Sequence, residues 1–383
     1  GELKKITPDI PVTTNLMGFY PELDYFKWAK EMDVVSWDNY PSLDTPYSHT
    51  AMTHALMRGL KGGQPFMLME QTPSVQNWQP YNSAKRPGVM RLWSYQAVAH
   101  GADTVMFFQL RRSIGACEKY HGAVIEHAGH EHTRVFRECA ELGKELQQLG
   151  DKLLDARSDA RVAIIYDWEN RWGIELSSGP SIALNYVGEV HKYYDALHQL
   201  HIQTDMISVE DDLSQYDVVV APVMYMSKQG FAERVEAFVS QGGTFLTTFF
   251  SGIVNENDLV TLGGYPGELR KVLGIWAEEI DALLPGTQNQ MVIRGRQGRL
   301  EGDYDCGILC DVIHAEGAEV VAEYGSDYYQ GTPSLTVVLN HTANPQEVSL
   351  GESVYVDLLT GREERERCII PGRGVMILED TGN

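Results

Sequence analysis

The sequence has few cysteines, and those it has do not form a recognisable set. Five cysteines among 383 residues are an odd number for a disulfide framework, so we expect all five to be reduced thiols. Cys306 and Cys310 have no second cysteine pair or histidine cluster nearby, which excludes the usual spacing of a zinc site. We therefore expect no metal and no cofactor. The five are Cys117, Cys139, Cys306, Cys310 and Cys368.

Basic residues are also scarce. Lys and Arg number 31 against 53 Asp and Glu, which gives a formal net charge of -22. Nucleic acids and anionic membranes both attract Lys and Arg, so this balance excludes both as partners. It favours a neutral substrate.

Long apolar runs are missing as well. No window approaches the roughly 20 apolar residues of a membrane span, and the first residues, GELKKITPDI, lack the apolar segment of a signal peptide. We expect a cytoplasmic protein. The hydrophobic fraction of 43% and the charged fraction of 22% are those of an ordinary globular chain, and the length predicts two or three domains.

Three parts follow one another along the chain. In residues 1–155, short apolar runs alternate with helical patterns, a βαβα rhythm that predicts a parallel sheet. Residues 156–330 begin with RVAIIYD and continue this alternation with a doubly wound character. Residues 331–383 are rich in strands separated by Gly and Pro, which predicts a small antiparallel β domain. The strands predicted in the first part are Val12–Leu16, Val34–Trp37, Pro65–Met69 and Thr104–Phe108.

Polar side chains follow three of these predicted strands. Glu70 ends the run PFMLME, Asp38 follows VVSW, and Gln109 and Arg111 follow TVMFF. Carboxyl ends of parallel strands meet at one edge of a sheet, and barrel enzymes place catalytic acids there. Glu70 is thus either a catalytic carboxylate or an ordinary loop carboxylate.

Three segments of the first part together carry a family resemblance. They are SWDNYP (residues 36–41), MEQTPS with NWQPYN (residues 69–82) and FFQLRRSIGACEKYHGAVIEHAG (residues 107–129). They resemble the second half of the catalytic (β/α)8 barrel of the family 42 glycoside hydrolases, the bacterial β-galactosidases. The middle part resembles the trimerisation domain of that family, with an amidotransferase-like fold, and LNHT…DLLTG resembles its C-terminal β domain.

The resemblance implies a role for each matching residue. Glu70 matches the nucleophile on barrel strand seven, which forms a covalent galactosyl-enzyme in a retaining mechanism. Trp78 matches the indole that covers the galactose ring. Glu118 and His121 match a pair that hydrogen-bonds galactose hydroxyls, and Asp38 matches a further polar residue of the site. For Trp78 a loop-packing role, for His121 a structural role, and for Asp38 the orientation of a neighbour are the alternatives.

The sequence departs from the family pattern at the second catalytic group. Retaining cleavage needs two carboxylates about 5–5.5 Å apart, and the acid/base of the family follows an Asn at the end of strand four. If Glu70 ends strand seven, strands one to four are missing from residues 1–383. The Asn255-Glu256 pair lies in the middle part, so we reject it as the acid/base.

Two hypotheses of different classes follow. In the first, the chain is the C-terminal part of a homotrimeric retaining β-galactosidase whose site needs a missing N-terminal barrel half, so that the chain alone is inactive on its β-galactoside substrate. In the second, the chain is a non-catalytic unit for oligomerisation or scaffolding. An unpaired edge of a half-barrel would favour association in either case.

Overall fold

The computed structural model describes residues 1–294, 300, 302–337, 346–357, 363–370 and 378–380. The chain divides into two compact units. The first contains Gly1–Ala160 and Tyr194–Ser208, and the second contains Arg161–Tyr193 and Val209–Asn383. The predicted three-domain division at residues 155 and 330 stays a prediction.

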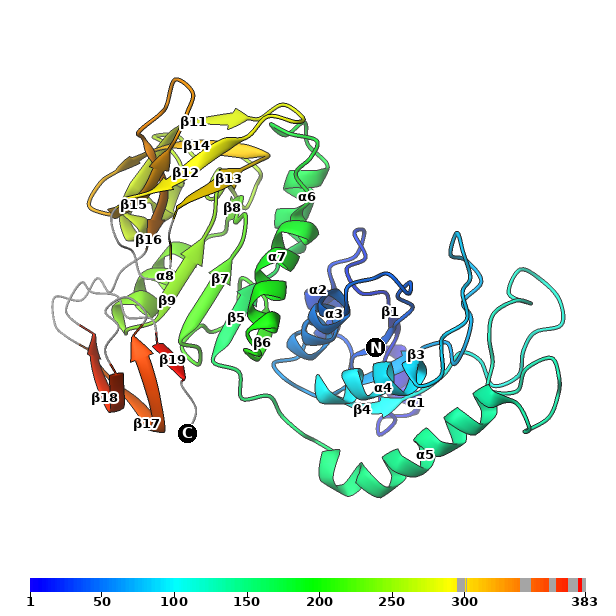
Figure 1. Cartoon of the computed structure of the whole chain (residues 1–383). Coiled ribbons are helices and arrows are strands. Elements are labelled where there is room, and N and C mark those ends of the chain that lie inside the picture. Colours follow the sequence, from blue (N-terminus) through cyan, green and yellow to red (C-terminus); the bar gives the residue numbers. More distant parts are fainter. Residues whose placement is uncertain (295–299, 301, 338–345, 358–362, 371–377, 381–383) are drawn as a thin grey trace. The chain divides into compact units, whose positions relative to one another are not determined.

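The first unit alternates helices and strands, as the sequence rhythm predicts (Figure 1). Its helices are α1 (Glu2–Ile6), α2 (Tyr25–Ala29), α3 (Tyr47–Gly59), α4 (Val89–Ala99) and α5 (Arg134–Leu153). Its strands are β1 (Asn15–Leu16), β2 (Ser36–Asp38), β3 (Phe66–Glu70) and β4 (Ala102–Val105), with β6 (Thr204–Ile207) in its second segment.

Strands β1 to β4 form one parallel sheet in the consecutive order β1-β2-β3-β4. Consecutive order without a reversal is the strand order of a barrel, whereas a doubly wound sheet reverses at its switch point. The four strands predicted from the sequence are therefore present and neighbours in the predicted order. β1 pairs with β2 alone, so its other edge has no partner within this sheet.

All four strands are shorter or shifted relative to the prediction, and the first and the last differ most. β1 contains only Asn15 and Leu16 of the predicted Val12–Leu16. The last strand spans Ala102–Val105 and not Thr104–Phe108, because its ladder with β3 starts at Phe66↔Ala102 and ends at Leu68↔Val105. Gly101 has φ +103° directly after α4, as expected for a helix stop.

Helix α3 places a histidine and an arginine in the core of the first unit. Arg58 donates to Asp205 Oδ1 at 2.6 Å and to the backbone oxygen of His100 at 2.7 Å. His54 is fully buried, its ring lies 5.0 Å from that of Trp37, and neither ring nitrogen has a hydrogen-bond partner among the described residues. Burial, with the charges of His100 and Arg58, lowers the pKa of His54 well below its ordinary value.

We predict that His54→Leu weakens the acid sensitivity of the chain. The unfolded chain protonates His54 as the pH falls through about 6.5, while the folded chain keeps it neutral, so this stability is complete at pH 8 and is lost as the pH falls below 6.5. The slope of unfolding free energy against pH between 7 and 5 should fall by up to about 1.4 kcal/mol per pH unit, measured by urea unfolding. His130→Leu, at an exposed position, is the control. An identical slope in His54→Leu and wild type would contradict this assignment.

The second unit contains a second parallel sheet. Its strands β5 (Val162–Ile165), β7 (Val218–Ala221) and β9 (Thr244–Thr247) pair in parallel in the order β5-β7-β9. The helical elements of this part are α6 (Trp168–Glu175), α7 (Tyr186–Gln199), α8 (Phe231–Ser240), the 3₁₀ turn η1 (Gly267–Leu269) and α9 (Arg270–Leu273). Helix α7 begins in the second unit and ends in the first.

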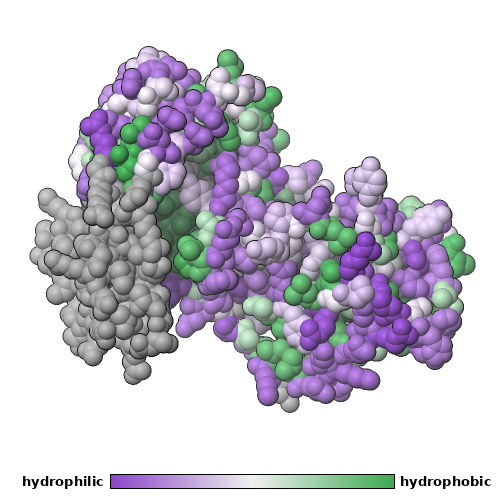
Figure 2. Space-filling view, viewed as in Figure 1, coloured by the Kyte–Doolittle hydropathy of each residue, from purple (hydrophilic) through white to green (hydrophobic). Residues whose placement is uncertain are grey.

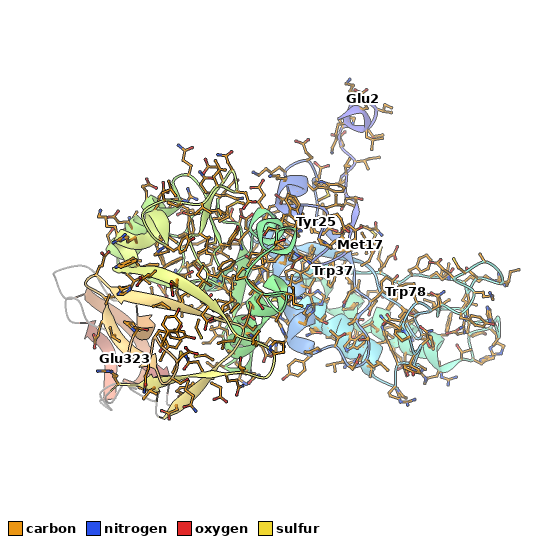
Figure 3. All side chains as sticks on the ribbon, turned by 90° about the horizontal axis from the view of Figure 1, so that it is seen from above. Glu2, Met17, Tyr25, Trp37, Trp78 and Glu323 are labelled. Atoms are coloured by element: carbon orange, nitrogen blue, oxygen red, sulfur yellow. The ribbon has the colours of Figure 1, made fainter. Side chains whose placement is uncertain are left out.

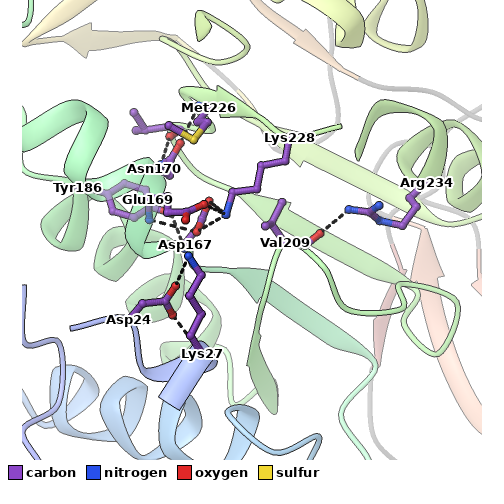
Figure 4. A network of polar contacts seen from close by, with 11 residues as sticks. Asp24, Lys27, Asp167, Glu169, Asn170, Tyr186, Val209, Met226, Lys228 and Arg234 are labelled. Atoms are coloured by element: carbon purple, nitrogen blue, oxygen red, sulfur yellow. Dashed lines mark hydrogen bonds and ion pairs between the residues drawn. The ribbon is translucent and has the colours of Figure 1, made fainter. Parts of the chain in front are cut away.

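Tight turns and buried polar contacts fix this sheet. Gly242 has φ +103°, and a Cβ on Gly243 would lie 2.2 Å from the Phe238 ring, so the turn after α8 needs both glycines. At the other end of the sheet Lys228 lies between Asp167 and Glu169, at 3.0 and 2.7 Å (Figure 4).

The turn after β7 has a strained backbone, as in a nucleophile elbow, but it carries valine at the strained position. Val223 is buried and has φ +46°, which is costly for a β-branched residue. Its N–H is held by Thr248 Oγ1 at 2.8 Å, and its carbonyl accepts from Asn170 at 2.9 Å. A Cys or Ser at such an elbow would be a candidate nucleophile, and valine offers no such chemistry.

Antiparallel strands begin earlier than the sequence pattern predicts. They start at Ile275 and not near Thr332, and form the pair β11-β14, the sheet β13-β12-β15-β16 and the sheet β18-β17-β19. β11 buries mainly Ala277, so its apolar alternation is weak, which is why the pattern was missed. The remaining strands are β8 (Met226–Ser227), β10 (Val254–Asn255), β11 (Ile275–Ala282), β12 (Asn289–Ile293), β13 (Asp303–Cys306), β14 (Leu309–Ala315), β15 (Glu319–Tyr324), β16 (Pro333–Val337), β17 (Gln346–Asp357), β18 (Glu363–Ile370) and β19 (Leu378–Asp380).

Hydrophilic residues cover most of the described surface on the face seen in Figure 2, and hydrophobic residues form small separate groups there. None of the helices in the described part of the chain combines the length and apolar character of a membrane span. Within the same part, Cys117, Cys139, Cys306 and Cys310 are free thiols, and no three His, Cys, Asp or Glu residues are arranged to hold a metal ion. The side chain of Cys368 lies outside the described residues.

Candidate active site

The carboxyl ends of β1, β2 and β3 bring polar side chains together at one edge of the first sheet. Glu70 is the last residue of β3 and Asp38 the last of β2. Asp38 and Glu70 are partners in the parallel ladder, but the ladder is irregular here, because Trp37 pairs with Leu68 and Asp38 then pairs with Glu70, so that Met69 is passed over. This irregularity places the two predicted carboxylates side by side.

Both oxygens of the Glu70 carboxylate accept hydrogen bonds. The hydroxyl of Tyr40 donates to Oε2 at 2.7 Å, and the amide of Asn15 donates to Oε1 at 3.1 Å. The same Asn15 nitrogen lies 3.0 Å from Asp38 Oδ1 and 3.2 Å from Oδ2. One amide group thus bridges the two carboxylates, while the phenol holds Glu70 from its other oxygen.

The environment of Asp38 favours its protonated form. Burial and, next, the charge of Glu70 raise the pKa of Asp38 to about 7, against the opposing hydrogen bond from Asn15. Two neighbouring carboxylates resist simultaneous ionisation because their like charges repel. Burial, the hydrogen bond to Glu70 and the negative charges of Glu70, Asp38 and Glu118 raise the pKa of Tyr40, so Tyr40 stays a donor.

Aromatic rings continue from Tyr40 into the loops after β3 and β4. The Tyr40 and Trp78 ring centroids are 4.8 Å apart at 81°, and Trp78 stacks on His121 at 4.9 Å and 21°. Phe108 meets His121 edge to face at 5.2 Å. Trp78, labelled in Figure 3, keeps 47% of its surface exposed, so an indole is presented next to the residue that holds Glu70.

His121 is placed differently from the prediction of a direct ligand contact. Its side chain is fully buried, its Nε2 lies 3.0 Å from the backbone oxygen of Phe108, and its Nδ1 lies 3.3 Å from Asn77 Oδ1. Burial lowers the pKa of His121, against the Phe108 carbonyl and the charge of Glu118. In this geometry His121 supports Trp78. Glu118 is partly exposed, and its predicted contact with a sugar stays a prediction.

The loop that carries Glu118 and His121 is tightly held. A Cβ on Gly122 would lie 2.7 Å from the backbone nitrogen of Val75, so only glycine allows this approach. The Gly122 N–H donates to the Val75 oxygen at 2.6 Å. Arg112 pairs with Glu126 at 2.7 Å. These contacts join the loop after β4 to the loop that carries Trp78.

A buried lysine anchors the loop after β3. Lys85 is 4% exposed, donates to the backbone oxygen of Thr72, and its ammonium lies 4.6 Å from the centroid of the Trp93 ring. Burial lowers the pKa of Lys85 to about 7. The charge of this lysine is thus costly in the folded chain near neutral pH.

We predict that Lys85→Met removes a rise of stability with increasing pH. Between about 7 and the ordinary lysine value of 10.5, the unfolded chain carries one proton more than the folded chain, so folding gains up to about 1.4 kcal/mol per pH unit. Chemical unfolding at pH 7, 8 and 9 should show this rise in wild type and in Lys144→Met, which is exposed, and not in Lys85→Met. A rise of equal size in all three proteins would show that Lys85 does not cause it.

Sequence reasoning missed Asn15 as a site residue and gave Tyr40 no role. A polar residue near the tip of a predicted strand was the available signal for Asn15. Of the residues predicted after the last strand, Arg111 is exposed, and Gln109 Oε1 accepts from Ser113 at 3.2 Å. Glu256, rejected as a catalytic acid, is exposed and belongs to the second unit.

Two protein families match this chain. Residues 1–149 match the family described as "Beta-galactosidase", and residues 160–359 match the one described as "Beta-galactosidase trimerisation domain". These matches agree with the family resemblance predicted from the sequence.

Curated relatives cover most of the chain. The β-galactosidase BgaP of Planococcus sp. (strain L4) is 75% identical over 335 residues, which are 88% of this chain and 50% of that protein. The β-galactosidase BglY of Alicyclobacillus acidocaldarius is 49% identical over 343 residues, again 88% and 50%. The chain thus spans about half the length of the curated relatives that it matches.

Solved structures of β-galactosidases are also similar to this chain. The β-galactosidase from Bacillus circulans sp. alkalophilus has a TM-score of 0.87 and 70% identity, over 99% of this chain and 65% of that one. The enzyme from Rahnella sp. R3 has a TM-score of 0.84 and 39% identity, over 99% and 65%.

Proposed function

This chain belongs to the family 42 β-galactosidases, and we propose that it is the C-terminal part of a retaining enzyme with Glu70 as the nucleophile. A Glu70 oxygen attacks the anomeric carbon of a terminal β-galactoside while the bond from that carbon to the aglycone oxygen breaks. An acid carried by sequence outside this chain protonates the departing oxygen. Water then hydrolyses the galactosyl-enzyme, with the same group acting as base.

The observation that carries the proposal is the arrangement around Glu70. The carboxylate stands at the carboxyl end of a parallel strand, where barrel enzymes place their catalytic groups. Tyr40 and Asn15 each hold one of its oxygens, which fixes its orientation before substrate arrives. The half-exposed indole of Trp78 lies against Tyr40 and offers the flat apolar surface that suits the C–H face of a sugar.

Asp38 does not meet the requirements of the missing acid/base, although its pKa of about 7 resembles that of a general acid. In a retaining enzyme the two catalytic carboxylates flank the scissile bond, and the sugar lies between them. Asp38 and Glu70 instead accept hydrogen bonds from one amide nitrogen, on neighbouring strands. A sugar cannot lie between two carboxylates that are bridged in this way.

The remaining predicted residues take supporting roles in the proposal. Trp78 covers the galactose ring, and Glu118 accepts hydrogen bonds from galactose hydroxyls. His121 stacks on Trp78 and holds its ring in place. A contact between His121 and a galactose hydroxyl requires the loop to rearrange when substrate binds. The preferred linkage and aglycone depend on loops of both barrel halves.

We predict that the chain alone does not hydrolyse lactose. We also predict that the half of BgaP outside the match, which we expect to be its N-terminal part, restores hydrolysis when the two are produced together. Loss of a general acid costs about 10²–10⁴-fold. Glu70→Gln should abolish the restored activity, because an amide cannot form the galactosyl ester, and Glu31→Gln, an exposed carboxylate, should preserve it. Turnover of lactose, followed as released glucose, is the measurement.

Efficient hydrolysis of lactose by the chain alone would refute the proposal that the acid/base lies outside this chain. Restored activity that survives Glu70→Gln would refute the nucleophile. A nitrophenyl galactoside is a less stringent substrate, since its leaving group needs little protonation.

A second candidate function is oligomerisation without catalysis, and the match of residues 160–359 to a trimerisation domain favours it. The valine at the β7 elbow agrees with a structural role for this part, because it provides no nucleophile. The two functions are compatible, since a trimer can also carry the catalytic part.

We predict that the chain forms a homotrimer through this part. Light scattering coupled to size exclusion at micromolar concentration should give three times the chain mass of 42.9 kDa. Residues 161–383 produced alone should give the same stoichiometry if the second unit carries the contacts. A clean monomer of the full chain would contradict the assignment.

A further inference from the structure

Asn15 is the one described side chain that hydrogen-bonds to both Asp38 and Glu70. It comes from β1, while the carboxylates come from β2 and β3. An amide group has two N–H donors, and here one points to each carboxylate. The proposed function uses only the contact of Asn15 with Glu70, and the contact with Asp38 has no role there.

We propose that Asn15 is a positioning residue that holds the nucleophile Glu70 and its neighbour Asp38 in one fixed arrangement. The proposal rests on the function proposed for Glu70. Asn15 fixes Oε1, Tyr40 fixes Oε2, and rotation of the Glu70 carboxylate would break both hydrogen bonds. A nucleophile that is held in this way is already oriented for attack when substrate binds.

The bridge also sets how easily Asp38 takes up a proton. The titratable groups that act on Asp38 or respond to its charge are Glu70 on β3, Tyr40 beyond β2, and Tyr25 on α2. Glu70 raises the pKa of Asp38, and the Asn15 hydrogen bond lowers it. Without Asn15, Asp38 should take up its proton at higher pH, and the cluster should be less negative near neutral pH.

The position of Asn15 makes it suitable for mutation. Asn15 is exposed, and its strand pairs with β2 alone in the sheet, so its replacement leaves no cavity in the core. Thr14 is also exposed and adjacent in the chain. Thr14→Ala is therefore the matched control for Asn15→Ala.

The first test needs no catalysis. Carboxyl carbons labelled with ¹³C in the purified chain report the titration of Asp38, assigned with Asp38→Asn. The apparent pKa of Asp38 should rise in Asn15→Ala relative to the chain and to Thr14→Ala, because an ion-favouring hydrogen bond is lost. An unchanged apparent pKa of Asp38 in Asn15→Ala would overturn the proposal that Asn15 bridges Asp38 and Glu70.

The second test uses the chain together with the N-terminal part of BgaP. A misplaced reacting group costs up to about 100-fold in rate, so Asn15→Ala should lower kcat by about 10- to 100-fold, with KM within a factor of two. A rise of KM at unchanged kcat would overturn the proposal and make Asn15 a substrate-binding residue. Absence of activity with wild-type Asn15 would refute the proposed function, while the titration still decides on Asn15.

Discussion

The parallel register of β2 and β3 is the constraint on which the site depends. It makes Asp38 and Glu70 partners, so their side chains lie together at one end of the sheet. Two carboxylates in this position repel each other. Hydrogen-bond donors offset this repulsion: Asn15 donates to both carboxylates, and Tyr40 donates to the other oxygen of Glu70. Without the irregularity between Trp37 and Asp38 in this ladder, Asp38 would pair with Met69 and the cluster would separate.

The loops after β3 and β4 extend this cluster into a surface for a sugar. Tyr40 contacts Trp78, and Trp78 stacks on the buried His121, so the donor to Glu70 and the exposed indole are held by the same set of rings. Gly122 and the buried Lys85 fix the two loops against each other and against the sheet. The pairing of the strands determines the geometry of the carboxylates, and the packing of the loops positions the aromatic surface beside them.

The alternation of apolar runs with helical patterns predicted four parallel strands, and the resemblance to the second half of a (β/α)8 barrel implied their consecutive order. The sequence predicted Glu70, Asp38 and Trp78 as site residues, and the structure places Glu70 beside Asp38 and Trp78 against Tyr40, the donor to Glu70. It missed the bridging role of Asn15, since a hydrogen bond across three strands leaves no local pattern. It missed the antiparallel strands from Ile275, whose weakly buried faces blur the alternation. The contact of His121 with a sugar stays a prediction, and its ring nitrogens here lie next to the Phe108 and Asn77 oxygens.

The most direct measurement is covalent trapping of the nucleophile. The chain, combined with the N-terminal part of BgaP, is treated with 2-deoxy-2-fluoro-β-galactosyl fluoride, whose glycosyl-enzyme hydrolyses slowly, and the labelled residue is located by peptide mass mapping. The account predicts one fluorogalactosyl group on Glu70 and none after Glu70→Gln. A label on Asp38, Glu118 or any other carboxylate, in a complex that hydrolyses lactose, would contradict it.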